Sequence, residues 1–135
     1  MPKTYSLFIS HCWDYADDYV RLIDLLDDAA NFSYKNYSVP KMDPLHANNE
    51  AKLKEDLERQ IRPTSIVIIL AGMYAHHSHW VGIEMDIAKR RGKPMIGIKP
   101  WGAERTPVDV QIAVRELVSW NTSSIVNAIK THSLS

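Results

Sequence analysis

Short apolar runs alternate along this chain with longer stretches in which apolar residues recur every three or four positions. Three runs, "TYSLFIS" (4–10), "SIVIIL" (65–70) and "MIGIK" (95–99), have the character of buried strands. The second is β-branched and apolar on both faces, as is typical of the centre of a parallel sheet. Two further strands are predicted: the aromatic, alternating "NFSYKNYSV" (31–39), expected at a sheet edge, and the short "LVSW" (117–120).

Helical periodicity fills the intervals between these strands. The first helix has Asp14 as its N-cap and Asp17 and Asp18 in its first turn, where the helix dipole favours acids. The other predicted helices are 50–61, with Leu53, Leu57 and Ile61 on one side and Pro63 after its end; Trp80 to about Arg91, stopped by Gly92 and Pro94; 107–116; and 122–130, capped by Thr122 or Ser123.

This alternation predicts one α/β domain over residues 1–135, a flavodoxin-like, three-layer fold of about five parallel strands with helices on both faces. In such sheets the ligand crevice lies beyond the carboxyl ends of the strands. Four segments are expected to meet there: 10–13, the proline-bearing loop 40–49, 71–79 and 99–101.

Composition narrows the choice of partners. The formal net charge is zero, which argues against a nucleic-acid binder that depends on neutralising phosphates. The single cysteine, Cys12, excludes an intramolecular disulfide and fits a reducing cytoplasm. The N-terminal segment lacks the long apolar core of a signal peptide, and no apolar run approaches the ~20 residues that span a membrane. We therefore expect a cytoplasmic protein that binds neither membrane nor nucleic acid.

Glu84 breaks the pattern of its helix. Asp86 has Lys89 and Arg90 three and four residues away, so it is expected to be an ordinary solvated acid with cationic partners. The residues three and four positions from Glu84 are all apolar: Trp80, Val81, Ile87 and Ala88. A carboxylate in an apolar stripe needs a reason, and by itself it is at the margin of the stripe more often than it is a functional group.

Several other classes of protein with this fold are excluded, because this sequence lacks the residues that their functions require. The first strand ends in Ser10-His11, where a phosphoacceptor receiver needs acids, and there is no dinucleotide fingerprint, P-loop or serine nucleophile elbow. The histidines His76, His77 and His79 have no second cluster of ligands, so no metal site is predicted. Nothing in the sequence marks a base that would activate Cys12 as a nucleophile, and a buried, inert thiol is expected.

Three features together resemble the TIR domain superfamily: the strand end "FISH", the proline-bearing loop after the second strand, and W-x-x-x-E on the third helix. The closer similarity is to the TIR-like proteins of the prokaryotic Thoeris anti-phage systems. It extends over nearly the whole chain, through "FISHCWDYADDY", "YKNYSVPKMDPLH", "QIRPTSIVIILAGMYA", "HWVGIEMDIAKRRGKPMIGIKPWG" and "SIVNAIK".

The resemblance implies an activity. TIR enzymes of this kind cleave NAD at the nicotinamide–ribose bond, and some cyclise or transfer the ADP-ribose to make a signal molecule that activates a separate effector. It implies that Glu84 is the catalytic glutamate with Trp80 as its partner, and that Ser10, His11 and Trp13 line the nicotinamide-ribose pocket. The counterpart of the BB loop would contain Met42, Asp43 and His46; this loop has no glycine, unlike that of several TIR branches.

The chemistry suits a single buried carboxylate. Nicotinamide leaves as a neutral group, so no acid is needed, and one anion beneath the ribose can stabilise the oxocarbenium character that the sugar develops. This gives Glu84 a reason to lie among apolar residues. The flat pyridinium cation can stack on Trp13, Tyr74 or Trp80, with attraction on the order of 0.5–2 kcal/mol. NAD is then the substrate, and no other cofactor is required.

Two further interpretations remain open. A TIR-like module can bind a protein partner or a nucleotide without turnover, and a nucleoside deoxyribosyltransferase-like enzyme would also place one glutamate under a ribose. For the NAD-cleaving enzyme, the resemblance implies a separate effector that senses the product and an activity that waits for a phage-derived trigger. It leaves open homo-oligomer formation and the product: a cyclised, conjugated or linear ADP-ribose.

Overall fold

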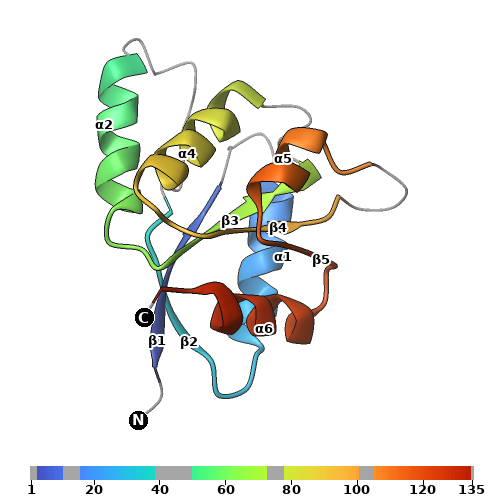
Figure 1. Ribbon diagram of the computed structural model, residues 1–135. Helices are drawn as coiled ribbons and strands as arrows, with labels where there is room; N and C mark the ends of the chain where they lie inside the picture. The colour runs from blue at the N-terminus through green and yellow to red at the C-terminus, as the bar shows by residue number, and fades with distance from the viewer. Residues whose placement is uncertain (1–2, 11–15, 39–49, 73–77, 101–104, 135) are drawn as a thin grey trace.

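The computed structural model describes residues 3–10, 16–38, 50–72, 78–100 and 105–134, in which strands and helices alternate (Figure 1). The elements are β1 (Thr4–Ile9), α1 (Ala16–Asp27), β2 (Ser33–Asn36), α2 (Glu50–Ile61), β3 (Ile66–Leu70), α4 (Ser78–Arg90), β4 (Met95–Ile98), α5 (Val108–Ala113), β5 (Glu116–Val118) and α6 (Thr122–His132).

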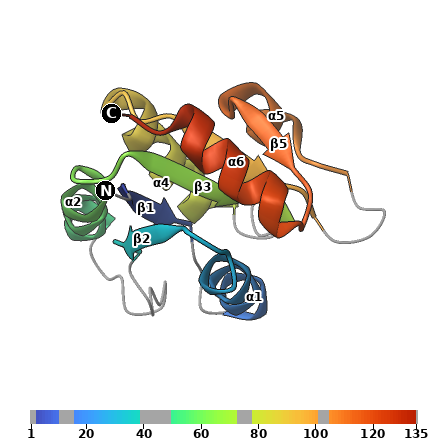
Figure 2. The same cartoon turned by 90° about the horizontal axis from the view of Figure 1, so that it is seen from below.

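The described strands form one sheet in the order β2-β1-β3-β4-β5, and each neighbouring pair is parallel. This is the flavodoxin-like order. Helices α2 and α4 pack on each other on one side of β3, while α1 and α6 pack on the other side (Figures 1 and 2). The predicted fold class is therefore confirmed, including the position of β2 at an edge of the sheet.

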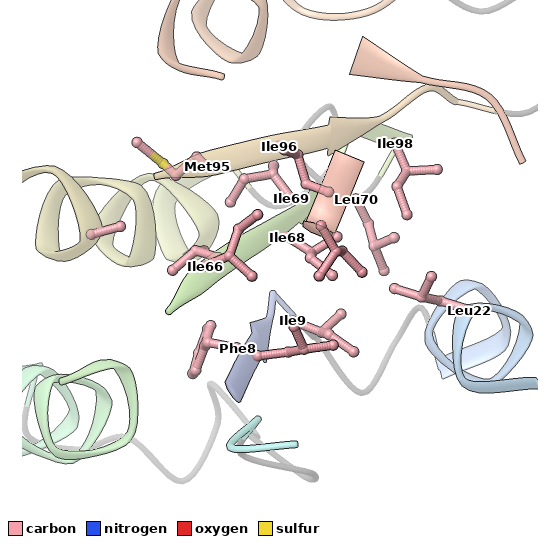
Figure 3. Packing of buried hydrophobic residues seen from close by; sticks show 14 of the residues in the cluster. Phe8, Ile9, Leu22, Ile66, Ile68, Ile69, Leu70, Met95, Ile96 and Ile98 are labelled. Atoms are coloured by element: carbon pink, nitrogen blue, oxygen red, sulfur yellow. The ribbon is translucent and has the colours of Figure 1, made fainter. Parts of the chain in front are cut away.

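The core lies on both faces of the sheet. Every residue of β3 is buried, as its apolar sequence predicts. Side chains from β1, β3, β4 and α1 interdigitate around it (Figure 3). Leu57 and Ile61 of α2 are also fully buried, which confirms the predicted apolar side of that helix at these two positions. The framework that holds the carboxyl ends of the strands is thus fixed by tightly packed aliphatic residues.

Helix α4 ends at the predicted stop signal. Gly92 has φ of 69°, in the left-handed region that glycine adopts without a Cβ penalty. Its N–H donates to the Lys89 carbonyl at 3.1 Å, and the Lys93 N–H donates to the Ala88 carbonyl at 2.8 Å. These two bonds form a Schellman motif, which satisfies carbonyls that the helix end would leave free.

Two predicted boundaries near the C-terminus are wrong. Asn121, not Thr122 or Ser123, is the N-cap of α6: its side-chain oxygen accepts from the Ser124 N–H at 3.0 Å. The helix predicted over 107–116 ends at Ala113, because Glu116 already belongs to β5, where it pairs with Ile96 of β4. The predicted N-cap Asp14 lies outside the described residues.

Gly97 of β4 faces α5 and β5 at close range, and its replacement by alanine is expected to lower the free energy of unfolding by about 1–3 kcal/mol. A Cβ at this position would lie 2.8 Å from Leu117 Cδ2 and 3.3 Å from both Val110 Cγ1 and Val114 Cγ1. Urea denaturation measures the loss. Gly82→Ala is the matched control, because nothing lies within 4 Å of its Cβ. Equal stability of Gly97→Ala and the wild type would contradict the close packing.

Candidate functional site

The candidate site is at the carboxyl end of the sheet, where Ser10 joins β1 to β3. The Ser10 N–H donates to the Ile68 carbonyl at 2.9 Å, and its Oγ accepts from the Leu70 N–H at 3.2 Å. Ser10 is fully buried. Its hydroxyl oxygen therefore holds the ends of two central strands together, in addition to any contact with a ligand.

The ends of β3 and β4 also approach α1 at this edge. A methyl group on Gly72 would lie 3.7 Å from Pro100 and 3.8 Å from Asp18 Oδ2. The Lys99 carbonyl accepts from Trp120 Nε1 at 2.9 Å, which ties the end of β4 to the chain after β5. In the described part of the chain, segments predicted to meet at the crevice do come together.

Glu84 lies in the second turn of α4, and none of its surface is exposed. Neither carboxylate oxygen has a hydrogen-bond partner among the described residues. Burial removes water from the carboxylate, and this desolvation raises the pKa of Glu84 well above its usual value of 4.5. Because an unpaired buried anion is costly, this environment favours the neutral, protonated form of the carboxyl group.

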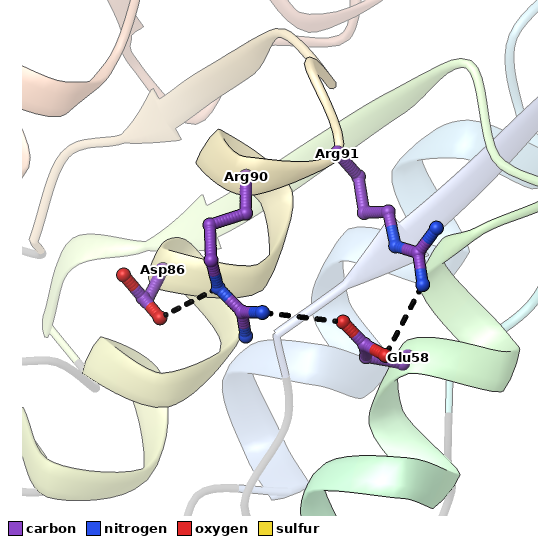
Figure 4. A network of polar contacts seen from close by, with 4 residues as sticks. All are labelled: Glu58, Asp86, Arg90 and Arg91. Atoms are coloured by element: carbon purple, nitrogen blue, oxygen red, sulfur yellow. Dashed lines mark hydrogen bonds and ion pairs between the residues drawn. The ribbon is translucent and has the colours of Figure 1, made fainter.

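Unlike Glu84, the charged side chains of Asp86, Arg90 and Arg91 form ion pairs (Figure 4). Asp86 Oδ2 accepts from Arg90 Nε at 3.1 Å, as its spacing predicts. Arg90 also lies 3.5 Å from one oxygen of Glu58 on α2, and Arg91 lies 3.2 Å from the other. All these side chains are partly or largely exposed, so water screens the pairs. Glu84 is the one acid of the described residues that is fully buried.

The remaining predicted site residues are only partly placed. The backbone of Trp80 lies in α4, one helical turn before Glu84, while its side chain is outside the described part of the molecule. Five predicted substrate contacts lie outside the described residues, as does Met42 of the BB-loop counterpart; the five are His11, Trp13, Asp43, His46 and Tyr74. Their roles stay predictions.

Sequence reasoning missed a polar chain beside Ser10. The Ser38 hydroxyl oxygen accepts from the Ile9 N–H at 2.9 Å, and Asn36 Oδ1 accepts from both the N–H and the hydroxyl of Ser38, at 2.9 and 2.5 Å. Asn36 Nδ2 donates to the Tyr19 hydroxyl at 2.6 Å. The signal in the sequence is a small polar residue just after an edge strand, which is too common to single out.

Metal-binding clusters and membrane-spanning helices are both absent from the described part of the chain. Among the described residues, no group of three or more His, Cys, Asp or Glu side chains lies close enough together to hold a metal ion; His79 is exposed, and His76 and His77 are outside those residues. Within the same ranges, no helix has the length and apolarity needed to cross a membrane.

Comparison with known proteins decides the family. The model of the family described as "Thoeris protein ThsB, TIR-like domain" matches residues 8–105. This chain belongs to that family. The match to the ThsB TIR-like family includes the end of β1, all of β3, Glu84 and the predicted BB-loop counterpart, and it makes this a Thoeris defence-related TIR-like protein.

Other comparisons add little to that assignment. No curated protein matches the chain. Among solved structures, a 3-dehydroquinate dehydratase-like protein from Bifidobacterium longum is 7% identical, with a TM-score of 0.48 over 96% of this chain and 94% of that one.

Proposed function

We propose that this protein is an NAD-cleaving enzyme that releases nicotinamide and makes an ADP-ribose-derived signal in anti-phage defence. The observation that carries the proposal is Glu84: a fully buried carboxyl group, with no partner among the described residues, on α4 of a ThsB TIR-like chain. A domain that only docks partners gains nothing from such a group, because its burial costs folding free energy.

The proposed reaction breaks one bond. The electron pair of the C1′–N bond goes to the nicotinamide nitrogen, which removes the positive charge of the pyridinium and lets nicotinamide leave neutral. The ribose then carries the positive charge, shared between C1′ and the ring oxygen, until a nucleophile donates an electron pair to C1′ and forms the new bond. The nucleophile is a group of the same ADP-ribose for a cyclic isomer, or a separate acceptor molecule for a conjugate, and the proton that it loses goes to solvent. Glu84 stabilises this cation electrostatically and accepts hydrogen bonds from the 2′- and 3′-hydroxyls, in a site where low hydration makes its field strong.

The proton of Glu84 must be lost for this role. In the free protein, desolvation raises the pKa of this carboxyl group and so favours its neutral form. Bound NAD supplies a pyridinium cation and two hydroxyl donors, and both favour the ionised carboxylate. Binding of the substrate is therefore expected to release the proton to solvent, so that the carboxylate is charged only when the group it stabilises is present.

The remaining contacts are proposed on the chemistry of NAD. Trp13, Tyr74 and Trp80 offer faces on which the pyridinium can stack. Ser10 and His11 would line the pocket for nicotinamide and its ribose, and Asp43 and His46 would approach from the loop after β2. NAD is the substrate, and no further cofactor enters the reaction.

The partners follow from the reaction. The product is proposed to be sensed by a separate effector protein, and activity in cells is expected to wait for a phage-derived trigger. Assembly into homo-oligomers and a cytoplasmic location are part of the same proposal. The product is an ADP-ribose derivative, either a cyclic isomer or a conjugate.

Mass spectrometry of small molecules from phage-challenged cells tests the proposal. Cells that carry the wild-type protein are expected to lose NAD and to gain nicotinamide and a new ADP-ribose derivative, whereas cells that carry Glu84→Gln keep their NAD. The two proteins must be present in equal amounts. Equal NAD loss and identical new metabolites in both strains would remove the enzymatic assignment and leave a nucleotide-binding or protein-interaction module.

A further inference from the structure

Lys99 is the one charged residue among the described residues that come directly after the strands of the sheet. It follows Ile98, the last residue of β4. The residues that follow the other described strands are uncharged: Ser10, Tyr37, Ala71 and Ser119. A parallel sheet of this kind binds its ligand at the carboxyl ends of the strands. We propose that the Lys99 ammonium group binds the diphosphate of NAD, an inference that rests on the proposed function.

The backbone of Lys99 is held at both its N–H and its carbonyl. The N–H donates to the Val118 carbonyl at 2.9 Å, and the Lys99 carbonyl accepts from Trp120 Nε1 at 2.9 Å. The first of these bonds extends the pairing of β4 with β5 one residue beyond Ile98. Lys99 therefore keeps the alternation of the strand, and its side chain belongs to the same face of the sheet as Gly97.

That face of the sheet is the one that α4 and α5 cover. A Cβ on Gly97 would lie 3.3 Å from both Val110 of α5 and Val114 at its end, and α5 lies with α4 above the sheet in Figure 1. Glu84 is on the inner side of α4, since it is fully buried together with its helical neighbours Val81 and Ala88. Lys99 and Glu84 therefore share one face of the sheet.

Lys99 lies nearer the carboxyl edge of the sheet than Glu84 does. The Lys93 N–H donates to the Ala88 carbonyl, so the end of α4 lies beside the approach to β4. From Ala88 back to Glu84 the helix rises about 6 Å toward the carboxyl edge, whereas the extended chain rises about 13 Å from Met95 to Lys99. A ribose placed over Glu84 can then direct its 5′-phosphate toward Lys99, at the outer end of the site.

The charges along this edge suit NAD in one orientation. The side chain of Lys99 is exposed, so its ammonium group is accessible to an anion. A Cβ on Gly72 would lie 3.7 Å from Pro100 and 3.8 Å from Asp18 Oδ2, which puts the Asp18 carboxylate beside the end of β3 on the α1 side. Asp18 repels a diphosphate and attracts a pyridinium, whereas Lys99 does the reverse. The diphosphate is therefore directed toward β4, and the nicotinamide toward β1 and β3.

Binding of ADP-ribose tests the assignment of Lys99 without any turnover. ADP-ribose has the diphosphate but lacks nicotinamide, and isothermal titration calorimetry on the full chain measures its Kd. Lys99→Gln is expected to raise this Kd about five- to tenfold, because a charge-assisted hydrogen bond is lost at an accessible site. Lys99→Arg keeps the cation and is expected to remain within about twofold of the wild type. The Kd of Lys99→Gln should also depend less on salt concentration.

Two other cations serve as comparisons. Lys130→Gln is the matched control, because Lys130 is an exposed lysine in the last turn of α6, which packs on the opposite face of the sheet (Figure 2). Its Kd for ADP-ribose is expected to equal that of the wild type. Arg105 is the other described cation between β4 and α5. A rise in Kd with Arg105→Gln but not with Lys99→Gln would overturn the assignment of Lys99.

Failure of this inference can be distinguished from failure of the proposed function. If the wild type cleaves NAD and Lys99→Gln binds ADP-ribose as tightly as the wild type, the assignment of Lys99 is wrong and the proposed function stands. Absence of ADP-ribose binding to the wild type also overturns the assignment. If Lys99→Gln weakens binding, but the wild type leaves NAD intact in extract of phage-infected cells, Lys99 belongs to a site that binds nucleoside diphosphates without turnover.

Discussion

Glu84→Gln is expected to lower kcat for nicotinamide release by at least about 10²–10³-fold, the cost of removing one group that stabilises transition-state charge. The amide has the shape of the carboxyl group but cannot become an anion, so the oxocarbenium-like ribose loses its counter-charge. Binding of NAD depends mainly on other contacts, and KM is expected to change much less. Chromatographic detection of nicotinamide from purified, triggered protein measures both constants.

The charge of Glu84 in the free protein makes the Glu84→Gln variant informative. Because burial raises the pKa of Glu84 and favours its neutral form before substrate binds, glutamine is expected to match the charge of the resting state, and the fold is expected to survive the change. Asp86→Asn is the control, since Asp86 is exposed and paired with Arg90 on the outer face of the same helix. Activity of Glu84→Gln above about a tenth of the wild-type value would exclude the proposed role of the carboxylate.

The sequence predicted the architecture because its signals are local and strong. The β-branched run of β3 predicts a buried strand, and the glycine after α4 predicts the end of a helix. Both predictions are confirmed. The contrast between Glu84 and Asp86 was also readable, since the residues three and four positions away decide whether a helical acid is buried or paired. Periodicity therefore singled out Glu84, although by itself it favoured a position at the margin of the apolar stripe; in the structure Glu84 is the one fully buried acid of the described residues.

Two kinds of feature could not be predicted from the sequence. One is a choice among several suitable residues, and the other is a contact that depends on how two strands pair. Asn121, Thr122 and Ser123 are all good N-caps, and only the backbone at Asn121 decides among them. Glu116 fits a helix by propensity, yet pairing with β4 draws it into β5. The bond from the Ile9 N–H to Ser38 joins residues 29 positions apart and requires the register of β1 and β2.

Glu84 is unusual because it is fully buried and also has no hydrogen-bond partner among the described residues. A buried acid that was hydrogen-bonded would be a structural tie, as the Ser10 hydroxyl is between β1 and β3. A partnerless acid at the surface would be an ordinary solvated charge. Glu84 is fully buried, and no described residue bonds its oxygens, so its burial lowers the stability of the empty protein. Proteins keep such a destabilising buried group where a bound ligand offsets the loss of stability.

The stability of the free protein is therefore expected to fall as pH rises above about 4.5, through Glu84. Its pKa is raised in the folded state by desolvation, whereas the unfolded chain has the usual value of 4.5. Below 4.5 both states bind the proton and the stabilising contribution is fully present. Above it, only the folded state keeps the proton, so the free energy of unfolding decreases by up to about 1.4 kcal/mol per pH unit until the folded pKa is passed.

Urea denaturation at a series of pH values, compared between the wild type and Glu84→Gln, isolates this contribution. Every other titratable group is common to both proteins and cancels in the difference. The variant is expected to gain stability relative to the wild type as pH rises from about 4.5 toward neutrality, because glutamine has no proton to hold. Saturating NAD should reduce this gain, since the bound pyridinium favours the ionised carboxylate. Parallel curves for the two proteins between pH 4.5 and 7 would mean that the carboxylate of the free protein is paired or hydrated, and its resting state would then be the anion.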